Sequence, residues 1–550
     1  MNGSNRNVFF FALVVAFGGF IFGLDAALIS GTVRFVSAEF NLTDIQIGTV
    51  VSAPSFGVLF ALLITGYICN VFGRKNTLIG IAFIYIFSAI SSVLAQSYEA
   101  LVIARFIGGL AFTSLSVAAM YIGEVAPAKY RGKLVSMIQI NIVVGLSAAY
   151  FANYLLVELS QSSYQWVSTY AMQDNLWRWM LGVEVIPAVI WFVLLFTIPQ
   201  SPRWLVMKGN ETRAKAVLLR LTKCSTLAAE QLQTIKSSLT DYSDSGSYLA
   251  SFKQLLDSRV RAAVIIALTI ALVQQVTGIN AIMFYAPTVF EQLGVGTDAA
   301  FLNAVLIGLV SIVFTVVAIV LIDKLGRRPL VIGGLATATL SLFMCYIGFS
   351  QAEYSLSAEH IAEFSSLNTV TGLEQLIGQV YHSDVEFKRA LATVFSATQL
   401  QGFESDLIQR AATINAPLIS LGIAGFIAAF HFSIGPIMWV IFSEIFPTRI
   451  RGVAIPTFAF IASVVSYLVQ QFFPWQLNNF GAANIFLFYS ISGVIGFVLL
   501  YKIMPETKNK SIEEIEEQLA GVSAKKVLEG CEYFISDRRM YGGAGSSRDQ

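Results

Sequence analysis

Long apolar segments alternate with short polar ones along almost the whole chain. Twelve apolar stretches can be counted, at approximately 8–33, 45–70, 76–96, 100–124, 132–156, 177–199, 260–291, 300–323, 329–350, 413–443, 452–475 and 481–503. A helix of about 20 apolar residues is long enough to cross the hydrocarbon core of a bilayer. The pattern therefore predicts an all-α membrane protein with twelve transmembrane helices and the lipid bilayer as its surroundings.

Composition agrees with this prediction. Of the 550 residues 56% are hydrophobic and 13% are charged, whereas soluble domains carry about 25% charged residues. The net charge of +1 gives no indication of a nucleic-acid partner. The four cysteines are scattered without metal or disulfide spacing. The first apolar stretch contains Asp25 and lacks a small-residue cleavage pattern, which indicates a retained helix rather than a signal peptide.

Four short loops, at 73–75, 129–133, 324–328 and 449–451, are basic. In a twelve-helix count they lie on the same side of the membrane as both chain ends. Short basic loops stay in the cytoplasm, so we expect a multi-pass protein of the cell (inner or plasma) membrane with both termini cytoplasmic. The segment 351–410, with eight acidic against three basic residues, is then outside.

The basic loops belong to an internal repeat. Gly73-Arg74-Lys75 has a counterpart in Gly326-Arg327-Arg328, and in each half a Glu precedes an Arg-Gly by seven residues with Pro between them, at Glu124 and at Glu444. Two six-helix halves with parallel repeats are a transporter architecture whose site lies near the membrane midplane. The repeat predicts six-helix bundles at 1–199 and 260–504, a cytoplasmic helical linker at 200–259, and a cytoplasmic tail at 505–550 with a disordered end. Within the linker, the segments 211–221 and 227–239 are expected to form short helices with one apolar face.

The second half is longer than the first. From Gly326 to Glu444 is 118 positions, against 51 from Gly73 to Glu124, which locates an insert at about 351–410. Two apolar faces at helical spacing predict a small helical cap there; their members are Leu373, Leu376, Ile377 and Val380, and then Phe387, Leu391, Val394 and Phe395. A partly disordered loop is the alternative.

The repeated charges suggest a gate. Ion pairs at cytoplasmic helix ends could hold the two halves together on the inside and break when the inside opens. The residues of this predicted inside latch are Arg74, Glu124, Arg131, Arg327, Glu444 and Arg451. Basic loops that only set the topology are the alternative.

The stretch 274–285 places polar groups in the middle of an apolar run. Gln274, Gln275, Asn280 and Tyr285 lie there, with Gly278 and Pro287 as residues that interrupt a membrane helix where it lines a site. Polar groups at this depth are costly unless they face a cavity or a partner helix. We expect a ligand site made of amide and hydroxyl groups; polar contacts that only join helices are the alternative.

A buried acid and a buried base lie at similar depth. Counted from the inner, cytoplasmic ends of helices one and four at 1.5 Å per residue, Asp25 lies roughly 25 Å and Arg105 roughly 28 Å up, so they can pair. A carboxylate in a membrane helix needs a partner to stay charged. We expect Asp25 and Arg105 to form a proton site, with sodium as a variant; a static ion pair is the alternative.

The chain resembles the sugar porter family of the major facilitator superfamily. The resemblance rests on Gly18–Asp25, Ile29-Ser30-Gly31, Gly73-Arg74-Lys75, Arg105, Glu124–Gly132, Pro199–Leu205, Gln274–Tyr285, Asp323–Arg328, Gly435–Trp439, Glu444–Gly452 and Pro505–Lys508. It covers nearly everything except the insert and the last residues. It implies two six-helix bundles with alternating access, and a transporter rather than an enzyme, without a cofactor and active as a monomer.

The resemblance also implies further site residues. In helix ten the Gly435-Pro436 pair would act as a hinge, and Trp439 would offer its ring to the substrate, with Phe22 as aromatic lining. His431 could be a second titrating group or a helix-packing residue.

Some positions depart from the family pattern. Leu146, Ser311 and Ala462 stand where relatives often have Gln, Asn and Asn or Gln, and Gln200 and Asn70 stand where relatives have acids. The first three favour a ligand with a less polar edge, such as a pentose, deoxy sugar or cyclitol. The sequence predicts a proton-coupled sugar or polyol importer; an uncoupled facilitator, a non-transporting sugar sensor and a multidrug exporter are the alternatives.

Overall fold

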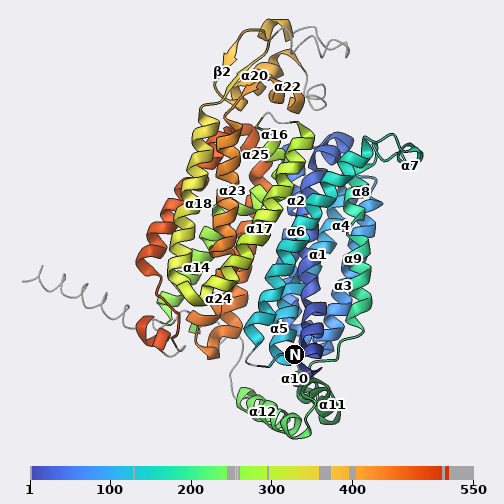
Figure 1. Ribbon diagram of the computed structural model, residues 1–550, viewed down its shortest axis with the longest axis vertical. Helices are drawn as coiled ribbons and strands as arrows, with labels where there is room; N and C mark the ends of the chain where they lie inside the picture. Colours follow the sequence, from blue (N-terminus) through green and yellow to red (C-terminus); the bar gives the residue numbers. More distant parts are fainter. Residues whose placement is uncertain are drawn as a thin grey trace, which may run out of the picture.

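The computed structural model describes residues 3–127, 130–243, 254–255, 257, 260–293, 296–357, 373–395, 404–510 and 514–519. Two groups of membrane-length helices stand side by side, which we call the N-terminal and C-terminal bundles (Figure 1). The helices α10, α11 and α12 lie beyond one end of the bundles, and a small domain stands on the opposite end. These two ends are named the linker side and the cap side.

The N-terminal bundle crosses the membrane six times. Its elements are α1 (Gly3–Phe40), α2 (Asp44–Phe72), α3 (Arg74–Val93), α4 (Tyr98–Leu110), the short η1 (Ala111–Thr113), α5 (Ser114–Val125), α6 (Arg131–Ser160), α7 (Gln165–Thr169), α8 (Leu176–Gly182) and α9 (Val185–Leu195). One crossing runs from α4 through η1 into α5 and another from α8 into α9. The second is broken at Val183 and Glu184, before Pro187, because a proline has no N–H for the helical ladder.

The C-terminal bundle has more broken helices. It comprises α14 (Arg261–Val276), α15 (Ile279–Phe284), α16 (Ala286–Glu291), α17 (Thr297–Leu325), α18 (Arg327–Ser350), α23 (Ala416–Phe432), α24 (Ile434–Ile445) and α25 (Thr448–Ile503). The break in helix ten lies at Ser433, just before Gly435-Pro436, so Pro436 sits in the first turn of α24. The predicted hinge is thus displaced by two residues.

The last helix contains two membrane crossings. Eleven segments are long and apolar enough to span a membrane, and the final one runs from Ile450 to Ile503. At 1.5 Å per residue it would measure about 80 Å, more than twice the bilayer core of about 30 Å. Gly481 adopts φ 78° and ψ 162° and turns the chain back. The described helices therefore make twelve crossings, as the hydrophobic pattern predicts.

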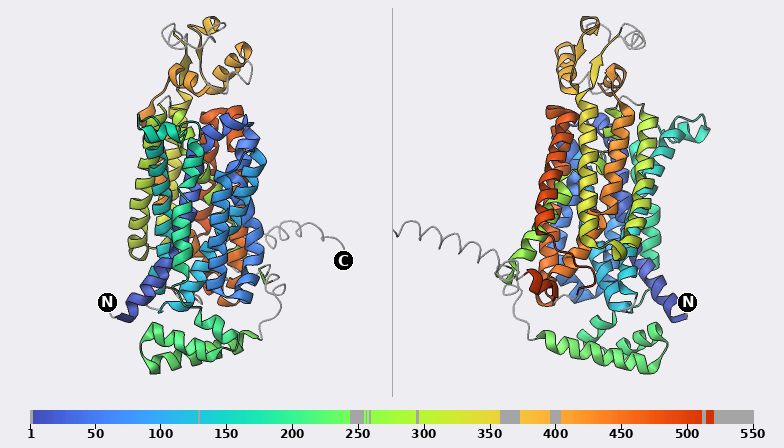
Figure 2. Two further views of the ribbon diagram at one scale, coloured as in Figure 1. Left: turned by 90° about the vertical axis from the view of Figure 1, so that its right-hand side faces the viewer. Right: turned by 60° about the vertical axis from the view of Figure 1, so that its left-hand side comes forward.

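The linker side carries the predicted amphipathic helices. They are α10 (Pro202–Met207), α11 (Glu211–Thr222) and α12 (Ser225–Ser243), and the chain begins on the same side (Figure 2). The expected helices at 211–221 and 227–239 match α11 and α12. The apolar face of α11, with Ala214, Leu218 and Leu221, is buried. The predicted disordered end of the tail lies outside the described residues.

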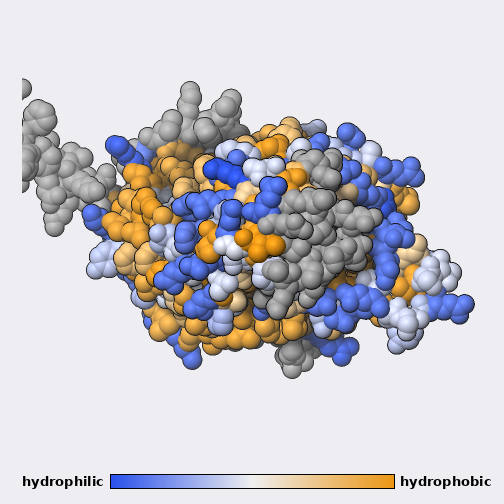
Figure 3. Space-filling model, turned by 90° about the horizontal axis from the view of Figure 1, so that it is seen from above, coloured by the Kyte–Doolittle hydropathy of each residue, from blue (hydrophilic) through white to orange (hydrophobic). Residues whose placement is uncertain are grey.

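The sides of the bundles are apolar. Seen from the cap side, hydrophilic residues gather on the exposed end and hydrophobic ones around the rim (Figure 3). Large apolar side chains stay exposed there, among them Leu63 at 71%, Ile186 at 68%, Leu340 at 66% and Leu421 at 64%. A belt of this kind suits contact with lipid tails, which need no hydrogen bonds from the protein.

The cap is a mixed domain and not a purely helical one. A three-stranded antiparallel sheet in the order β2-β1-β3 is formed by β1 (Glu353–Ser355), β2 (Val380–Tyr381) and β3 (Ala412–Thr413). It packs with η3 (Leu373–Leu376), α20 (Asp384–Val394) and α22 (Glu404–Ala411). The predicted helical face of Phe387 and Leu391 is confirmed in α20, where both are fully buried. The predicted single helix from Leu373 to Val380 is wrong, because its end joins the sheet.

The cap is fastened to the C-terminal bundle beside the Gly481 turn. The Asp384 carboxylate accepts the N–H of Ala482, and its Oδ1 lies 2.5 Å from the position that a Cβ at Gly481 would take. Lys388, one turn further along α20, donates to Asn478 Oδ1 at 2.6 Å. Asn478 in turn donates to Asp44 of α2 at 2.6 Å. The cap therefore contacts the point where the two bundles meet on the cap side.

Candidate substrate and proton sites

Helix seven is broken where the polar stretch lies. Gly278, between α14 and α15, has φ 84°, and a Cβ there would collide with the Tyr489 ring. A second break follows at Tyr285, with Pro287 near the start of α16. The predicted interruption at Gly278 is confirmed, and it turns the side chains of α14 and α15 toward the neighbouring α25.

Three amides form a continuous hydrogen-bond chain. Gln274 Nε2 lies 3.5 Å from the Gly435 carbonyl oxygen, Gln275 Nε2 donates to Gln274 Oε1 at 3.0 Å, and Asn280 Nδ2 donates to Gln275 Oε1 at 2.7 Å. Gln274 is buried, whereas Gln275 and Asn280 are half-buried. Amides that pair with one another can exchange these bonds for sugar hydroxyls without leaving a buried group unpaired.

The chain continues to a residue that the sequence analysis missed. Asn280 Nδ2 also donates to Ser466 Oγ of α25 at 2.6 Å, and Gln470 Nε2 donates to the same oxygen at 2.8 Å. In helix eleven the sequence analysis considers Ala462, one turn away from Ser466. The polar run Ser463, Ser466, Gln470 at helical spacing in an apolar helix is the signal that could have found them.

Two predicted binding residues are used for packing. Tyr285 is 1% exposed and its hydroxyl already donates to the Gln470 carbonyl oxygen at 2.9 Å. Phe22 packs edge-on against Phe112, with ring centres 4.7 Å apart. Tyr285 is therefore enclosed in this conformation, with its hydroxyl already bonded. Phe22 is half-buried, and its role as aromatic lining stays a prediction. Trp439, in contrast, is 47% exposed.

Three of the positions that depart from the family pattern, those within the membrane helices, are enclosed as well. Leu146 and Ala462 are 4% and 5% exposed, and the Ser311 hydroxyl donates to Ile307 O at 2.9 Å. His431 is buried, and its Nδ1 lies 3.2 Å from Thr315 Oγ1. This contact agrees with the helix-packing alternative for His431.

A buried charge cluster occupies the N-terminal bundle. Arg105 donates from both terminal nitrogens to Asp25, at 2.7 and 3.4 Å, and the predicted pairing is confirmed. Glu184, at the break between α8 and α9, lies beside Asp25 and is 5% exposed. Two carboxyls facing one guanidinium in a buried place favour a proton on one of them. A lone acid in an apolar stretch singled out Asp25, and the same signal could have found Glu184.

The repeated charges form ion pairs within each bundle. Arg74 bonds Glu124 at 2.8 Å and Arg327 bonds Glu444 at 3.0 Å. Each Glu also accepts a hydroxyl, from Ser201 and from Thr507. The expected bridges between the bundles are not formed in this conformation, because both partners of each pair belong to one bundle.

The two repeat arginines near Pro127 and Pro447 differ in their surroundings. Arg451 donates to the carbonyl oxygen of Phe446 in its own bundle at 3.0 and 3.3 Å. Arg131 is exposed at the start of α6. Neither residue is seen to join the bundles, so the inside latch stays a prediction for the state closed on the linker side.

The bundles are joined toward the cap side. Among the described residues, hydrogen bonds link α2 to α25, α1 to α17, α6 to α15, and Gln161, directly after α6, to α17. They connect Asp44 to Asn478, Ser52 and Thr49 to Gln471, Ser55 to Gln470, Arg34 to Thr297, Gln161 to Asp298 and Tyr150 to the Met283 carbonyl. These contacts close the cap side in this conformation.

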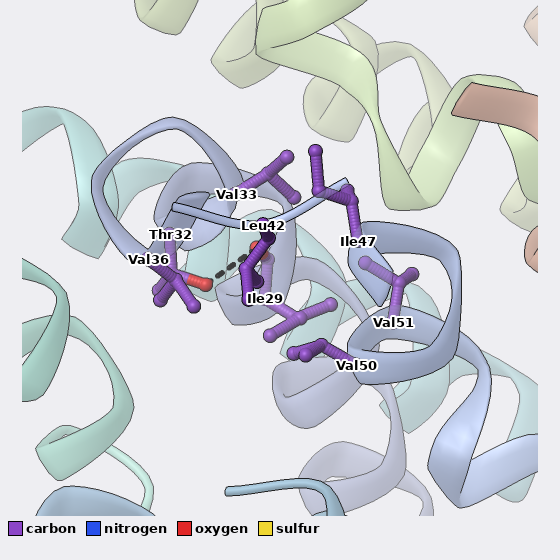
Figure 4. A pocket seen from close by; sticks show the side chains of 8 residues that line it. All are labelled: Ile29, Thr32, Val33, Val36, Leu42, Ile47, Val50 and Val51. Carbon is purple, nitrogen blue, oxygen red and sulfur yellow. Dashed lines mark hydrogen bonds between the residues drawn. The ribbon is translucent and has the colours of Figure 1, made fainter. Parts of the chain in front are cut away.

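The small recess between the cap-side ends of α1 and α2 is not a sugar site (Figure 4). It is lined by Ile29, Thr32, Val33, Val36, Leu42, Ile47, Val50 and Val51. Its single hydroxyl, on Thr32, already donates to Ile29 O at 2.8 Å. A lining of this kind cannot bind the hydroxyls of a sugar, and the amide chain remains the better site.

Comparison with known proteins gives the family. The model of the "Sugar (and other) transporter" family matches residues 11–367 and 391–519. The chain belongs to this family. Its architecture is the major facilitator fold, as the repeat and the twelve crossings indicate.

Several curated relatives are similar over nearly their whole length. The arabinose-proton symporter of Bacillus subtilis is 34% identical over 503 residues, which is 91% of this chain and 92% of the relative. The D-xylose-proton symporter of Escherichia coli K12 is 31% identical and covered over 95% of its length. The galactose-proton symporter of the same strain is 31% identical and covered over 94%.

Solved structures of the E. coli xylose transporter are similar too. Its partially occluded inward-open conformation matches with a TM-score of 0.69 at 27% identity, over 92% of this chain and 99% of that one. The same proton–xylose symporter bound to 6-bromo-6-deoxy-D-glucose matches with a TM-score of 0.67 at 29% identity, over 94% and 100%.

Proposed function

We propose that this protein imports a monosaccharide by proton symport with alternating access. The observation that carries the proposal is the separation of two polar clusters in an otherwise apolar core. The amide chain Gln274–Gln275–Asn280 lies in the C-terminal bundle, and the Asp25–Arg105–Glu184 cluster lies in the N-terminal bundle. One cluster suits hydroxyls and the other suits a proton. The curated names of the relatives support both assignments.

The protonation state of the Asp25–Arg105–Glu184 cluster can be coupled to which side of the transporter is open. When Asp25 is charged, its bidentate contact holds Arg105 to helix one. Protonation of a carboxyl in the cluster would weaken that contact, and a helix with altered contacts shifts the balance between outward- and inward-facing states. In this proposal the proton binds to the N-terminal bundle, and the sugar binds mainly to the C-terminal bundle.

The orientation in the membrane follows from the short basic loops. Those loops lie on the linker side, and short basic loops stay cytoplasmic. We assign the linker side, with α10–α12, to the cytoplasm, we expect both termini there, and we assign the cap to the outside. Each chain contains both clusters, so a monomer in the bilayer is sufficient for transport.

The substrate is assigned to the monosaccharides, with a pentose first. The C-terminal bundle keeps its amides, whereas Leu146, Ser311 and Ala462 offer no free hydrogen-bonding group toward a ligand. Each sugar hydroxyl that is buried without a partner costs about 1–3 kcal/mol. Arabinose or xylose should therefore bind better than glucose; deoxy sugars and cyclitols belong in the same panel.

The test is uptake of labelled sugars into proteoliposomes with and without an imposed proton gradient. Accumulation of a pentose above its external concentration, only when the gradient is present, is expected. Replacement of sodium by potassium should leave that accumulation unchanged. Preference for glucose over every pentose and cyclitol would contradict the substrate assignment alone.

An uncoupled facilitator is the second candidate, because the same amide chain would serve it. In that case the internal sugar concentration would approach the external one and stop there, whatever the gradient. A static Asp25–Arg105 pair, which only stabilises the bundle, would give this result.

A further inference from the structure

A polar path links the amide chain to the cap-side contact between the bundles. From Asn280 it runs through Ser466 Oγ to the Gln470 side chain, whose Oε1 accepts a hydrogen bond from Ser55 of α2 at 2.9 Å. Ser55 belongs to the N-terminal bundle. The path thus begins at a sugar-binding candidate and ends across the bundle interface.

Every side chain on the path has its orientation determined by its neighbour. Gln470 is 1% exposed, and its backbone carbonyl is held by the Tyr285 hydroxyl of helix seven. Ser466 Oγ accepts from two amide nitrogens, so its own hydrogen is not needed for either contact. Both hydrogens of Asn280 Nδ2 are used, one toward Gln275 and one toward Ser466.

The neighbouring glutamine contacts the same helix without reaching the site. Gln471 accepts from Ser52 at 2.8 Å and donates to Ile45 O and Thr49 Oγ1 at 2.9 and 3.1 Å. All three partners lie on α2. Gln471 therefore holds the cap side closed, whereas Gln470 both holds it closed and contacts the path to Asn280.

We infer that Gln470 and Ser466 are positioning residues that couple sugar binding to closure of the cap side. Closure brings Ser55 to Gln470, Gln470 fixes Ser466, and Ser466 fixes Asn280 in the orientation that reaches Gln275. Since coupling between sites is reciprocal, a sugar bound to this oriented amide favours the closed cap side in return. The inference rests on the proposed function, because it needs a sugar at the amide chain.

The experiment measures the distance between the bundles on the cap side. Spin labels are placed at Ala100→Cys, on the exposed start of α4, and Asn479→Cys, on the exposed end of helix eleven, in a protein with Cys224→Ser and Cys531→Ser. Distances are recorded with and without an equimolar mixture of arabinose, xylose, galactose and glucose. In the otherwise unsubstituted protein the mixture should raise the closed-to-open ratio about fivefold or more.

The two glutamines give a matched pair of variants. Gln470→Leu should shift the sugar-free protein toward the open cap side and abolish the response to sugar. Gln471→Leu should cause a similar sugar-free shift but keep the response. Ser466→Ala leaves the Ser55–Gln470 contact in place, and it should lower the response without the sugar-free shift.

The outcomes distinguish a failure of the coupling through Gln470 and Ser466 from a failure of the proposed sugar transport. Equal sugar responses in Gln470→Leu and Gln471→Leu, or a full response in Ser466→Ala, would overturn the coupling while leaving sugar transport intact. If no sugar binds the unsubstituted protein by calorimetry, the proposed function fails and the inference fails with it. If Gln470→Leu does not fold, Ser466→Ala alone decides.

Discussion

The two bundles have nearly the same structure at their linker-side ends and different groups in their centres. On the linker side, Arg74–Glu124 in one bundle corresponds to Arg327–Glu444 in the other, and Ser201 corresponds to Thr507 as the hydroxyl donor. In the centre, the N-terminal bundle holds an acid pair with Arg105 and the C-terminal bundle holds amides.

Where the linker-side ends of the two bundles differ in sequence, they still form equivalent hydrogen bonds. Gln200 Oε1 accepts the Lys75 N–H at 2.9 Å. Glu506 occupies the equivalent place and accepts the N–H groups of Arg327 and Arg328 at 3.0 and 3.1 Å. The comparison teaches that the repeat preserves the helix ends that move against one another, while the centres have specialised separately. Coupling and recognition can then be altered one at a time.

The largest effect is expected from the charged centre. Asp25→Asn should abolish uphill accumulation and spare sugar binding, because it removes the charge that Arg105 contacts without touching the amide chain. The measurement is the ratio of internal to external labelled arabinose under an imposed proton gradient. Glu158→Gln, an exposed acid on α6, is the control. A variant at Asp25 that still concentrates the sugar would remove the proton role from this cluster.

A substitution in the amide chain of the C-terminal bundle should weaken sugar binding itself. Gln275→Ala should weaken arabinose binding by roughly 5- to 150-fold, since about 1–3 kcal/mol is lost when a buried polar contact is left unmade. Calorimetry on purified protein measures it. Asn484→Ala, an exposed amide of the same bundle that bonds only Phe480 O, is the matched control. Unchanged affinity together with lost accumulation would place the sugar elsewhere.

The repeated ion pairs should behave alike in the two bundles. Glu124→Gln and Glu444→Gln each weaken an ion pair that is largely enclosed, with an expected effect of about 1 kcal/mol, or roughly fivefold in rate. Turnover should fall while the half-saturating sugar concentration changes little, because these helix ends act on the balance of states. Initial uptake rates over a range of arabinose concentrations test this. A loss of affinity at unchanged maximal rate would contradict the gating role.

A smaller effect is expected from one charged difference at the linker-side ends, Glu506 in the place that corresponds to Gln200. Burial raises the pKa of Glu506, but N–H donation from Lys508, Arg327, Arg328 and Thr507 outweighs it, and the pKa lies below its ordinary value of 4.5. A carboxyl with a depressed pKa stabilises the fold above its unfolded pKa, and that contribution disappears as the pH falls through its folded pKa.

The thermal unfolding temperature of the unsubstituted protein in detergent should therefore fall as the pH drops below about 4.5. Glu506→Gln should flatten part of that fall and leave the value at pH 7 only slightly lower. Lys208→Gln, an exposed residue on the same side, serves as a control. Identical pH profiles of the unfolding temperature for Glu506→Gln and the parent would show that the charge of Glu506 does not stabilise the fold.

The smallest effect on transport is expected from the cap. Removal of 355–408, with a short linker in its place, should leave a folded protein with nearly the same uptake, because the cap stands on one bundle outside the repeat. The Asp44–Asn478 contact would lose its Lys388 partner, so a modest shift toward the open cap side is expected. Failure to insert into the membrane would show that the cap is part of the bundle core.

Much of the fold was predictable because a membrane helix is marked by its own composition. The twelve crossings, the break at Gly278 and the Asp25–Arg105 pair follow from hydropathy, a glycine and depth along a helix. The helices α11, α12 and α20 followed from apolar faces at helical spacing.

The rest depended on contacts between distant parts of the chain. Ser466 becomes a site residue only because Asn280, 186 positions away, bends toward it at a broken helix. The sequence places Tyr285 among the ligand-site residues, and only the structure shows that its hydroxyl donates to the Gln470 carbonyl oxygen. The strands of the cap are two or three residues long, too short to show any alternation of apolar and polar positions. Which ion pairs form within a bundle depends on the conformation, which a sequence does not specify.

The attachment of the cap has a practical consequence for imaging. Detergent or lipid hides most of a transporter from the electron microscope, and particles without protruding mass are hard to align. Here α20 is clamped through Asp384 to the turn at Gly481, and the folded cap projects beyond the membrane-spanning helices (Figure 1). An antibody fragment raised against the cap would follow the C-terminal bundle as a rigid marker, and its tilt against the N-terminal bundle would report each step of the transport cycle.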